Sequence, residues 1–571
     1  MNKMVKKSLY LLAVGTLAVS CADYNETSNF VAQPDPSVVV PYADMASVKS
    51  YTDKVNYPNM TVGTQLKLSD FNNQALQHSA AMANFDDVTF GKDLMSGQII
   101  NSKGSMNFLP MTTLVEHAKS IGATVYGSPI AANTNQCDSW LSYLTAPIEI
   151  IVGFIEEKSV DFTQMAVGTK YGGGEIAKFN DKNQLRVGTL SKPNASVNIA
   201  DGFKVNHLSK YTITFTASAG QDKNGKDKDA SFQIIFSGND VPNPATTDGK
   251  YNIKAGKRAK FEVECRSAEG VKDGVFTIKN GRNVVVYVEN IEVGYYPDNH
   301  RDQYPEEVSD TIHYAINTWC DALMKTNEGC IKSFDLIDEP IDVNATLDNG
   351  KYDLKHAEID PETGKATQIF WQDIFGSEKY APTVAEAARK AYEKYGNNPA
   401  ELKFFIAETG LEEQKKLESL TYWIEQWENS SNGNFKVDGI NAKLNLVYNE
   451  DATTQQANEK AVEKLLDDLA ATGKLIRISN FDIKYTDAEG ASVAAAKITE
   501  QQRQQLANYY GWVINKYMTK IPSPQQAGIC KGSMVDTTDP VGLWLIDTDS
   551  KDWVRNATYK AFCDALSGKS N

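Results

Sequence analysis

The sequence has 571 residues, with 73 acidic and 58 basic side chains and a formal net charge of −15 at pH 7. A negative field of this kind repels phosphate, which excludes nucleic acid as the expected partner and is compatible with a neutral polysaccharide. The seven cysteines show no metal-like spacing and are interpreted as mostly buried thiols. We therefore expect no metal, no cofactor and no disulfide framework.

An export signal is predicted at the N-terminus. Three lysines within the first seven residues precede an apolar run at 9–19 that is too short to span a bilayer. The run ends in Leu-Ala-Val-Ser-Cys and resembles a bacterial lipobox, which implies a signal peptide at 1–20 and lipidation of Cys21. An ordinary cleaved signal with a chance cysteine is the alternative. Residues 21–50 are predicted to be the lipidated cysteine and a tether, because Asn, Ser, Pro and Asp are frequent there.

The residues after the lipobox bear on localisation. Asp23 and Glu26 resemble the acidic surface-export signal of Bacteroidetes lipoproteins. We therefore expect an outer-membrane protein that faces the cell surface and contacts the membrane through its lipid only. No other segment is long and apolar enough to cross a membrane.

Residues 51–155 and 300–571 alternate between short apolar strands and helical patterns. Repeated strand-helix units imply a parallel sheet, and this number of units favours a closed (β/α)8 TIM barrel, an α/β fold. The clearest predicted strands lie at 331–337, 402–407, 437–440, 475–478 and 528–534, and the clearest helices at 382–395, 457–472 and 500–516.

Residues 156–299 have a different residue pattern, in which predicted strands alternate with Gly-, Asn-, Asp- and Lys-rich turns. Strands are predicted at 211–217, 230–236, 260–265 and 284–293, with no convincing helix between them. This pattern indicates an antiparallel β-sandwich. Because an all-β segment interrupts an α/β one, we interpret it as a domain inserted into a surface loop of the barrel.

One predicted strand ends in a motif that contains candidate catalytic residues. The segment 331–340, IKSFDLIDEP, resembles the fourth-strand signature W-D-V-V-N-E of glycoside hydrolase family 10, the family of retaining endo-β-1,4-xylanases. The resemblance implies that Glu339 occupies the general acid/base position, with Phe334 in place of the Trp and Asp338 in place of the Asn. The catalytic groups of a barrel enzyme lie at the carboxyl ends of its strands, where this glutamate is expected.

Other segments resemble the same family in the same order. They are 125–140, similar to the third-strand motif; 437–440, similar to D-G-I-G-x-Q-x-H; 477–483, similar to the nucleophile strand T-E-L-D-I; and 543–562, similar to the closing strand and helix. The resemblance covers nearly all of the chain outside the insert. The insert itself resembles carbohydrate-binding modules, and a β-sandwich that interrupts the barrel is a layout of Bacteroidetes xylanases of this family.

The second carboxylate is missing at the matched position. A retaining glycosidase needs two carboxyl groups about 5 Å apart, and the resemblance puts Asn480 at the nucleophile. A neutral amide cannot attack the anomeric carbon. The motif histidines correspond to Ser128, Asn133 and Asn445, with Lys443 at the neighbouring Gln. We therefore expect lost or strongly reduced hydrolysis.

An active enzyme is the alternative. Burial and a neighbouring carboxylate would raise the pKa of Glu339, as a general acid requires. Asp482 lies two residues beyond Asn480, hence on the same face of a regular strand, and is a supporting residue in the family. It is the candidate for a rearranged second carboxylate in an inverting scheme.

Glycan binding needs aromatic rings and planar polar groups. Substrate-binding candidates from the barrel are Asn133, Trp140, Phe334, Asp338, Asn445, Trp544 and Trp553, and the insert offers Tyr171, Tyr211, Tyr251 and Tyr287. A sandwich that serves only as a spacer is the alternative for the insert. We expect a surface lipoprotein that binds β-xylan or a related polysaccharide. An outer-membrane glycan-uptake complex is a candidate partner. The alternative is an active endo-1,4-β-xylanase-type hydrolase.

Overall fold

The computed structural model describes residues 42–204, 210–236, 239–240, 250–266, 276–281, 283–548 and 550–569. The predicted signal peptide, Cys21 and most of the predicted tether lie outside these residues. The chain forms two compact units: one is Pro147–Gln303, and the other consists of the described residues up to Ala146 together with those from Tyr304 onward. The sequence pattern predicts the junctions at 155/156 and 299/300, close to the bounds of these units. Near the junctions the short strands β5 (Ile148–Glu149) and β18 (His300–Arg301) pair with each other.

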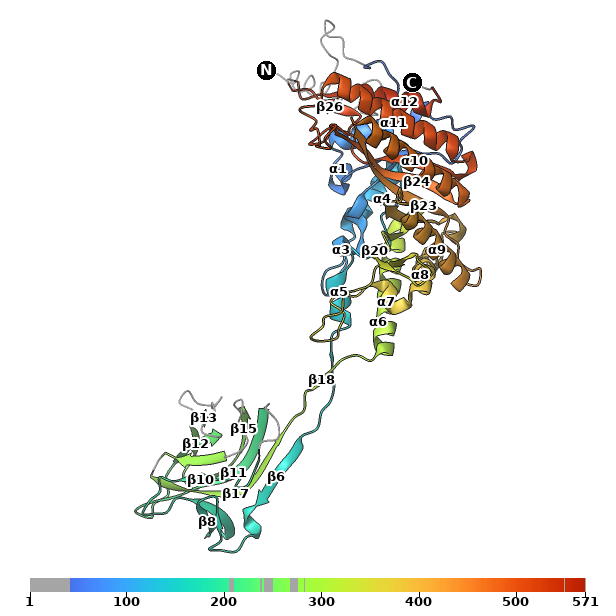
Figure 1. The fold of residues 1–571 in the computed structure, drawn as a ribbon. Coiled ribbons are helices and arrows are strands. Elements are labelled where there is room, and N and C mark those ends of the chain that lie inside the picture. Colours follow the sequence, from blue (N-terminus) through green and yellow to red (C-terminus); the bar gives the residue numbers. More distant parts are fainter. Residues whose placement is uncertain are drawn as a thin grey trace, which may run out of the picture. The chain divides into compact units, whose positions relative to one another are not determined.

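The barrel unit contains a sheet of nine hydrogen-bonded segments in which every pair is parallel (Figure 1). In spatial order they are β3 (Thr124–Val125), β2 (Asp87–Thr89), β1 (Val62–Gln65), β25 (Gln526–Lys531), β24 (Leu475–Thr486), β23 (Gly439–Asn449), β22 (Lys403–Thr409), β19 (Ser333–Asp338) and β4 (Ala131–Ala132). β3 and β4 are two parts of one extended stretch, and Gly127 between them bridges to Phe334. This contact closes the ring at eight strand positions, which confirms the predicted (β/α)8 barrel.

Helices alternate with these strands along the chain. They are α1 (Leu68–Asn72), α2 (Leu76–Asn84), α3 (Ser96–Ile99), α4 (Leu109–Ile121), α5 (Asp138–Leu144), α6 (Pro305–Asn327), α7 (Trp371–Phe375), α8 (Tyr380–Lys394), α9 (Gln414–Ser430), α10 (Ala452–Ala471), α11 (Glu500–Lys520) and α12 (Ala557–Leu566). α11 begins at a capping box in which Thr499 and Gln502 satisfy each other's backbone N–H groups. Two hairpins follow strand ends, β20 (Ile341–Thr346) with β21 (Tyr352–Leu354) and β26 (Trp544–Ile546) with β27 (Trp553–Arg555).

Two barrel strands are longer than the sequence pattern indicated. β23 and β24 remain paired beyond the ring of strands, from Asn445 opposite Asp482 to Asn449 opposite Thr486. Their alternating apolar residues, including Leu446 and Ile483, belong to the same core as the helices. The extension is stable because it buries one face, which a short apolar run in the sequence did not reveal.

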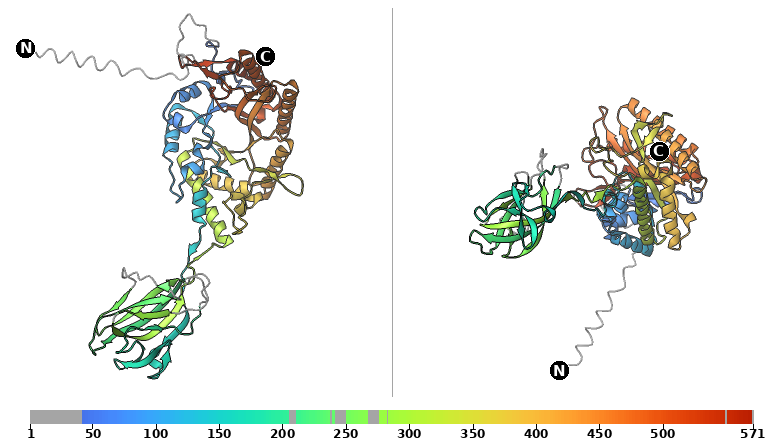
Figure 2. Two further views of the ribbon diagram at one scale, coloured as in Figure 1. Left: turned by 60° about the vertical axis from the view of Figure 1, so that its left-hand side comes forward. Right: turned by 90° about the horizontal axis from the view of Figure 1, so that it is seen from below.

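The insert is a sandwich of two antiparallel sheets, drawn in green in Figure 2. One sheet contains β15 (Arg258–Arg266), β11 (Lys210–Asp222), β17 (Val284–Tyr295), β9 (Lys182–Val187), β8 (Gly174–Phe179), β7 (Lys170–Tyr171) and β6 (Ile155–Asp161), which pairs with β17. The other contains β10 (Ser196–Asn198), β16 (Phe276–Asn280), β12 (Ala230–Phe236), β13 (Asn239–Asp240) and β14 (Tyr251–Ile253). Alternate residues of both sheets meet in a separate apolar core, as a sandwich requires. Across both units, the described helices include none that is long and apolar enough to cross a membrane.

Two histidines form an acid-sensitive contact between α2 and α4. His78 is 1% exposed, and its Nε2 lies 2.9 Å from Nε2 of His117, with Phe71 at the edge of both rings. Burial first, and then the neighbouring His117, lower the pKa of His78 to about 4. Two imidazolium ions cannot share this contact, so the pair is neutral at pH 7.

We expect the barrel unit to lose stability in mild acid through His78. The unfolded chain binds a proton near pH 6.5 and the folded chain only near pH 4, so stability is complete above pH 6.5 and falls as the pH drops. The loss amounts to up to roughly 3 kcal/mol of unfolding free energy by pH 4. Urea unfolding of His78→Gln should show a flatter pH dependence than the native chain, while His300→Ala, at a half-exposed histidine, should not. An unchanged slope in His78→Gln would contradict this assignment.

Candidate functional site at the carboxyl ends of the barrel strands

A cavity of about 370 Å³ opens at the carboxyl ends of the barrel strands. Its lining includes Asp338 and Glu339 at the end of β19, Lys443 on β23 and Asn480 on β24. The cavity therefore brings together residues that stand more than a hundred positions apart in the sequence. It lies where the barrel fold places catalytic groups.

Lys443 holds two carboxylates at once. Its Nζ donates to Asp338 and, at 3.1 Å, to Oε1 of Glu339. The side chains of Lys443 and Asp338 are 14% and 13% exposed and that of Glu339 is 35% exposed. A largely buried lysine between two acids is a charge-assisted contact, which is stronger than one on an open surface.

This contact reverses the expected titration of Glu339. Burial alone would raise the pKa of the carboxyl, but Lys443, with smaller contributions from Lys355 and Lys416, lowers the pKa below its ordinary value. The expectation of a raised pKa was wrong because it considered burial and Asp338 but no facing cation. Glu339 is therefore ionised at neutral pH and has no proton to give to a leaving group.

The acid with a raised pKa is a different residue, Asp335. It lies deeper in the cavity, accepts hydrogen bonds from Tyr126 Oη (2.7 Å) and Asn441 Nδ2 (3.0 Å), and is 6% exposed. Burial first, and then repulsion from Asp338, raise its pKa to about 6. Its hydrogen bonds fix it in the floor of the site.

A second ion pair closes the floor. The Arg477 guanidinium donates to both oxygens of Asp87, at 2.8 and 3.2 Å, and lies 4.1 Å from the centre of the Tyr126 ring. Both charged side chains are under 5% exposed. This pair occupies the interior of the barrel and gives the floor a fixed shape.

Asn480, which the resemblance matches to the nucleophile position, has an unusual backbone conformation. Its φ is +49°, and β24 contains one more residue than both neighbouring strands at this point. This is the geometry of a β-bulge, which re-aims side chains at a site. Glu339 has a similar φ of +47°, so both residues that the resemblance matches to catalytic positions have left-handed backbone at the cavity.

Asp482 does not reach the cavity. Its carboxylate accepts bonds from Lys531 Nζ and from the backbone N–H (3.0 Å) and hydroxyl (2.7 Å) of Ser533. The prediction that it shares a strand face with Asn480 assumed regular alternation, which the bulge breaks. Its oxygens are occupied by the eighth strand and not directed at a substrate site.

Two of the predicted polar contacts also lie away from the cavity lining. Asn133 is 7% exposed and its Oδ1 accepts a bond from Gln372 at 3.1 Å. Asn445 is exposed on β23, beyond the cavity and opposite Asp482. Ser128, Thr134 and Asn135, which come from the same segment as Asn133, do line the cavity.

The four barrel aromatics proposed as sugar-stacking residues are core residues instead. Trp140, Phe334, Trp544 and Trp553 are 4%, 2%, 1% and 7% exposed and belong to the barrel core. Phe334 fills the space beside Gly127, where an added Cβ would lie 2.2 Å from its ring. Sequence alone does not tell which aromatic side chain faces inward. In the insert, Tyr211 and Tyr251 are likewise buried, whereas Tyr171 and Tyr287 are half-buried.

Sequence reasoning missed the residues that set the charge of the site. The resemblance gives Lys443 only as a replacement for the family's Gln, and it assigns no role to Asp335, Asn441 or Arg477. A usable signal was present, because a lysine in the middle of an apolar strand needs a buried acidic partner. In the sheet, β22 lies between β23, which carries Lys443, and β19, which ends at Asp338.

The barrel unit is similar to known proteins. Residues 296–556 match the family model described as Glycosyl hydrolase family 10. The match lies within the second part of the barrel unit and the last residues before it, and it covers less than half of the chain. The first barrel strands precede the matched residues and complete the same ring. No curated protein matches the sequence.

Several solved structures are similar to this chain at low sequence identity. Native xylanase 10C from Cellvibrio japonicus has 12% identity and a TM-score of 0.50, with 94% of this chain and 75% of that chain covered. Endo-1,4-beta-xylanase XylE of Penicillium canescens has 10% identity and a TM-score of 0.46, covering 92% and 98%. Xylanase B of Clostridium stercorarium F9 has 11% identity and a TM-score of 0.47, covering 91% and 100%.

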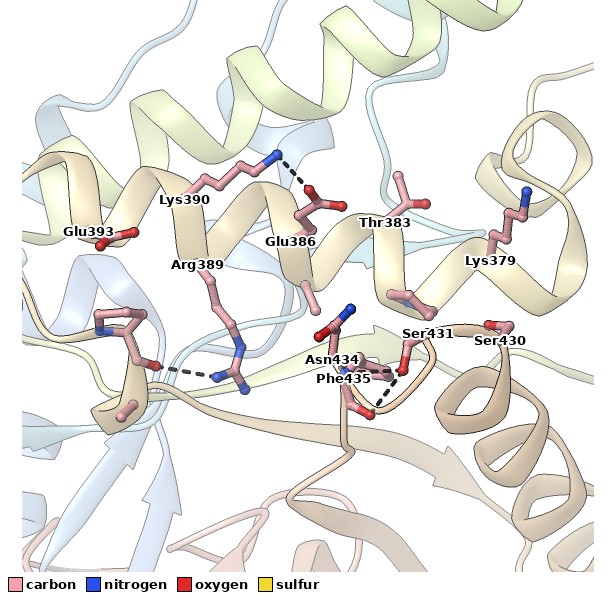
Figure 3. A pocket seen from close by; sticks show the side chains of 14 residues that line it. Lys379, Thr383, Glu386, Arg389, Lys390, Glu393, Ser430, Ser431, Asn434 and Phe435 are labelled. Carbon is pink, nitrogen blue, oxygen red and sulfur yellow. Dashed lines mark hydrogen bonds and ion pairs between the residues drawn. The ribbon is translucent and has the colours of Figure 1, made fainter.

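A larger hollow, of about 720 Å³, lies outside the family 10 cavity and is shown in Figure 3. It runs along α8 and the chain that follows α9. Its charged groups are paired locally: Lys390 with Glu386 at 2.5 Å, and Arg389 with the Pro399 carbonyl at 3.4 Å. These pairs are those of a solvated helix face, and no group in the hollow matches a chemical role of the family.

Removal of the central lysine should destabilise the barrel in a pH-dependent way. Lys443→Met leaves the buried Asp338 without its cation, which should cost roughly 2–4 kcal/mol of unfolding free energy at pH 7.5. The cost should shrink at pH 5, because carboxyls with raised pKa values then bind protons in the folded chain. Urea unfolding checks this, with Lys390→Met at an exposed pair as the matched control near zero. A Lys443→Met chain as stable as the native one at pH 7.5 would refute a structural role for the pair.

Proposed function

We propose that this chain captures β-1,4-xylan in the cavity of its family 10 domain and hydrolyses it weakly or not at all. The observation that carries the proposal is Lys443, which binds Asp338 and Glu339 at a site where Asn480 occupies the nucleophile position. General acid catalysis needs a protonated carboxyl, and a glycosyl-enzyme intermediate needs an anionic oxygen. At neutral pH Glu339 is ionised, and the side chain at the position matched to the nucleophile is the neutral amide of Asn480.

Binding chemistry remains in the cavity. Ser128 Oγ and Asn441 Oδ1 are buried polar atoms without a hydrogen-bond partner among the described residues, and both residues line the cavity. Buried polar groups left unpaired are costly, and sugar hydroxyls would satisfy them. Gln65 and Asn135 add planar polar groups to the same lining. The choice of xylan follows from the family 10 domain.

The second candidate is an active endo-1,4-β-xylanase-type hydrolase with Glu339 as acid/base. The presence of Glu339 in the cavity favours it. The bonds of Asp482 to Lys531 and Ser533 weigh against it, because they leave no free second carboxylate at the expected place. We therefore rank it below capture.

We further propose that Cys21 is lipidated, that the chain is anchored in the outer membrane facing the cell surface, and that it serves a glycan-uptake complex there. The N-terminal sequence pattern supports this part of the proposal. The insert is proposed to act as a carbohydrate-binding module, supported by its two-sheet sandwich.

Calorimetry and product analysis test capture against cleavage. The soluble protein from residue 22 is titrated with xylohexaose, and the same mixture is analysed after overnight incubation. We expect binding heat, intact hexaose and weaker binding by Ser128→Ala. Shortened products that disappear in Glu339→Gln would establish the hydrolase instead. Absence of binding heat would overturn capture.

The site should be reactivated by restoring both family groups. Lys443→Gln releases Glu339 from its cation, and Asn480→Glu supplies the second carboxylate. We expect the double variant to release short xylo-oligosaccharides at least about 100-fold faster than the native chain, a typical contribution of positioned acid-base groups. Lys443→Gln combined with Asn445→Glu, which places the new carboxylate outside the cavity, is the matched control. Equal rates in the two double variants would contradict the assignment of Asn480.

A further inference from the structure

The insert carries a stacked aromatic pair on the outer face of its seven-stranded sheet. Val286 and Val288 of β17 point into the sandwich core, so Tyr287 between them points outward. The Tyr287 ring lies parallel to that of Phe179, with the centroids 4.1 Å apart and the planes 5° from parallel, and both side chains are half-buried. A Cβ on Gly220 would lie 2.6 Å from Tyr287 Cε2, so this glycine makes the space in which the ring lies against the neighbouring strand.

A polar groove of about 560 Å³ adjoins this pair on the same face. Glu289, two residues after Tyr287 on β17, lies in the groove, and Lys182, the cross-strand partner of Phe179, lines it too. Glu289 is 8% exposed and accepts bonds from Lys182 at 2.5 Å and Arg258 at 2.6 Å. The three side chains therefore fix one another.

The groove also holds an unsatisfied amide. The Oδ1 atom of Asn290 is buried and has no hydrogen-bond partner among the described residues. A buried amide oxygen without a partner costs free energy that a ligand hydroxyl would recover. The groove is lined by the carboxylates of Asp161, Asp181, Glu289 and Glu292 and by the cations of Lys182 and Arg258. This excess of carboxylates disfavours an anionic ligand.

We infer that this face of the insert is a glycan-binding site separate from the barrel cavity, with Phe179 as the stacking surface and Glu289, Asn290 and Arg258 as hydroxyl partners. An apolar ring face beside fixed planar polar groups fits a neutral polyhydroxylated chain, whose rings present C–H faces and whose hydroxyls both donate and accept. Nothing in the matched family 10 region contributes to this site, because its residues precede residue 296.

The consequence rests on the proposed function of the barrel. Two glycan sites in one chain make the second contact with a polymer intramolecular, which strengthens attachment without a new contact. A short oligosaccharide engages one site at a time and gains nothing. The chain should therefore bind long xylan more tightly than xylohexaose, by a larger factor in affinity than either site would show alone.

Hydrogen exchange with peptide resolution locates the bound polymer on the full soluble chain. Soluble β-1,4-xylan should protect peptides of the β8–β9 hairpin, 174–187, and of β17, 284–295. Phe179→Ala and Arg258→Met should abolish this protection and weaken binding to the polymer about tenfold or more, with xylohexaose binding at the barrel unchanged. Tyr296→Ala, at a 54% exposed tyrosine of the same unit outside this face, is the matched control.

Two results would overturn the inference. One is protection confined to barrel peptides, and the other is equal polymer binding by Phe179→Ala, Arg258→Met and Tyr296→Ala. Failure of the proposed barrel function has a different signature, namely protected insert peptides with unprotected cavity peptides. The two sites are thereby tested independently in one experiment.

Discussion

The ion cluster formed by Lys443, Asp338 and Glu339 determines what the barrel site can do. A lysine that is 14% exposed is stable inside a barrel only if carboxylates surround it, and here it takes both acids at the end of β19. The attraction that stabilises the buried lysine also lowers the pKa of Glu339. The stability of the buried lysine and the lowered pKa of Glu339 therefore have one electrostatic cause.

The barrel supplies the geometry on which this cluster depends. Bulges in β19 and β24, and left-handed backbone at Glu339 and Asn480, turn these residues toward the common cavity. Beneath them the Arg477–Asp87 pair and the hydrogen bonds of Asp335 hold the floor. The cavity thus has a fixed floor, with Lys443 paired to both carboxylates at its edge.

Much of the fold was predictable from local patterns. Alternating strands and helices gave the (β/α)8 barrel, and the Gly- and Asn-rich strands gave the sandwich, because hydrophobic periodicity reports local burial. The motif ending in Asp338 and Glu339 placed these two residues at the correct strand end. Asn480 likewise falls at the cavity, as the match to the nucleophile strand predicted.

What the sequence could not reveal depends on neighbours that are distant along the chain. The pKa of Glu339 is set by Lys443, more than a hundred residues later, and the direction of Asp482 by a one-residue bulge. Trp544 and Trp140 are predicted to bind substrate but are buried, because the sequence pattern does not distinguish an aromatic ring that faces solvent from one that faces the core. Each of these features is a property of side-chain contacts across strands and not of local pattern.

A crystal structure of the full soluble chain soaked with xylohexaose tests the central claim most directly. We expect an uncut chain of sugar rings in the barrel cavity, with one ring beside Lys443 and Asn480 and the lysine still bonded to Glu339. A shortened product, a sugar bonded covalently to the protein, or Glu339 released from Lys443 and hydrogen-bonded to a glycosidic oxygen would contradict capture without cleavage.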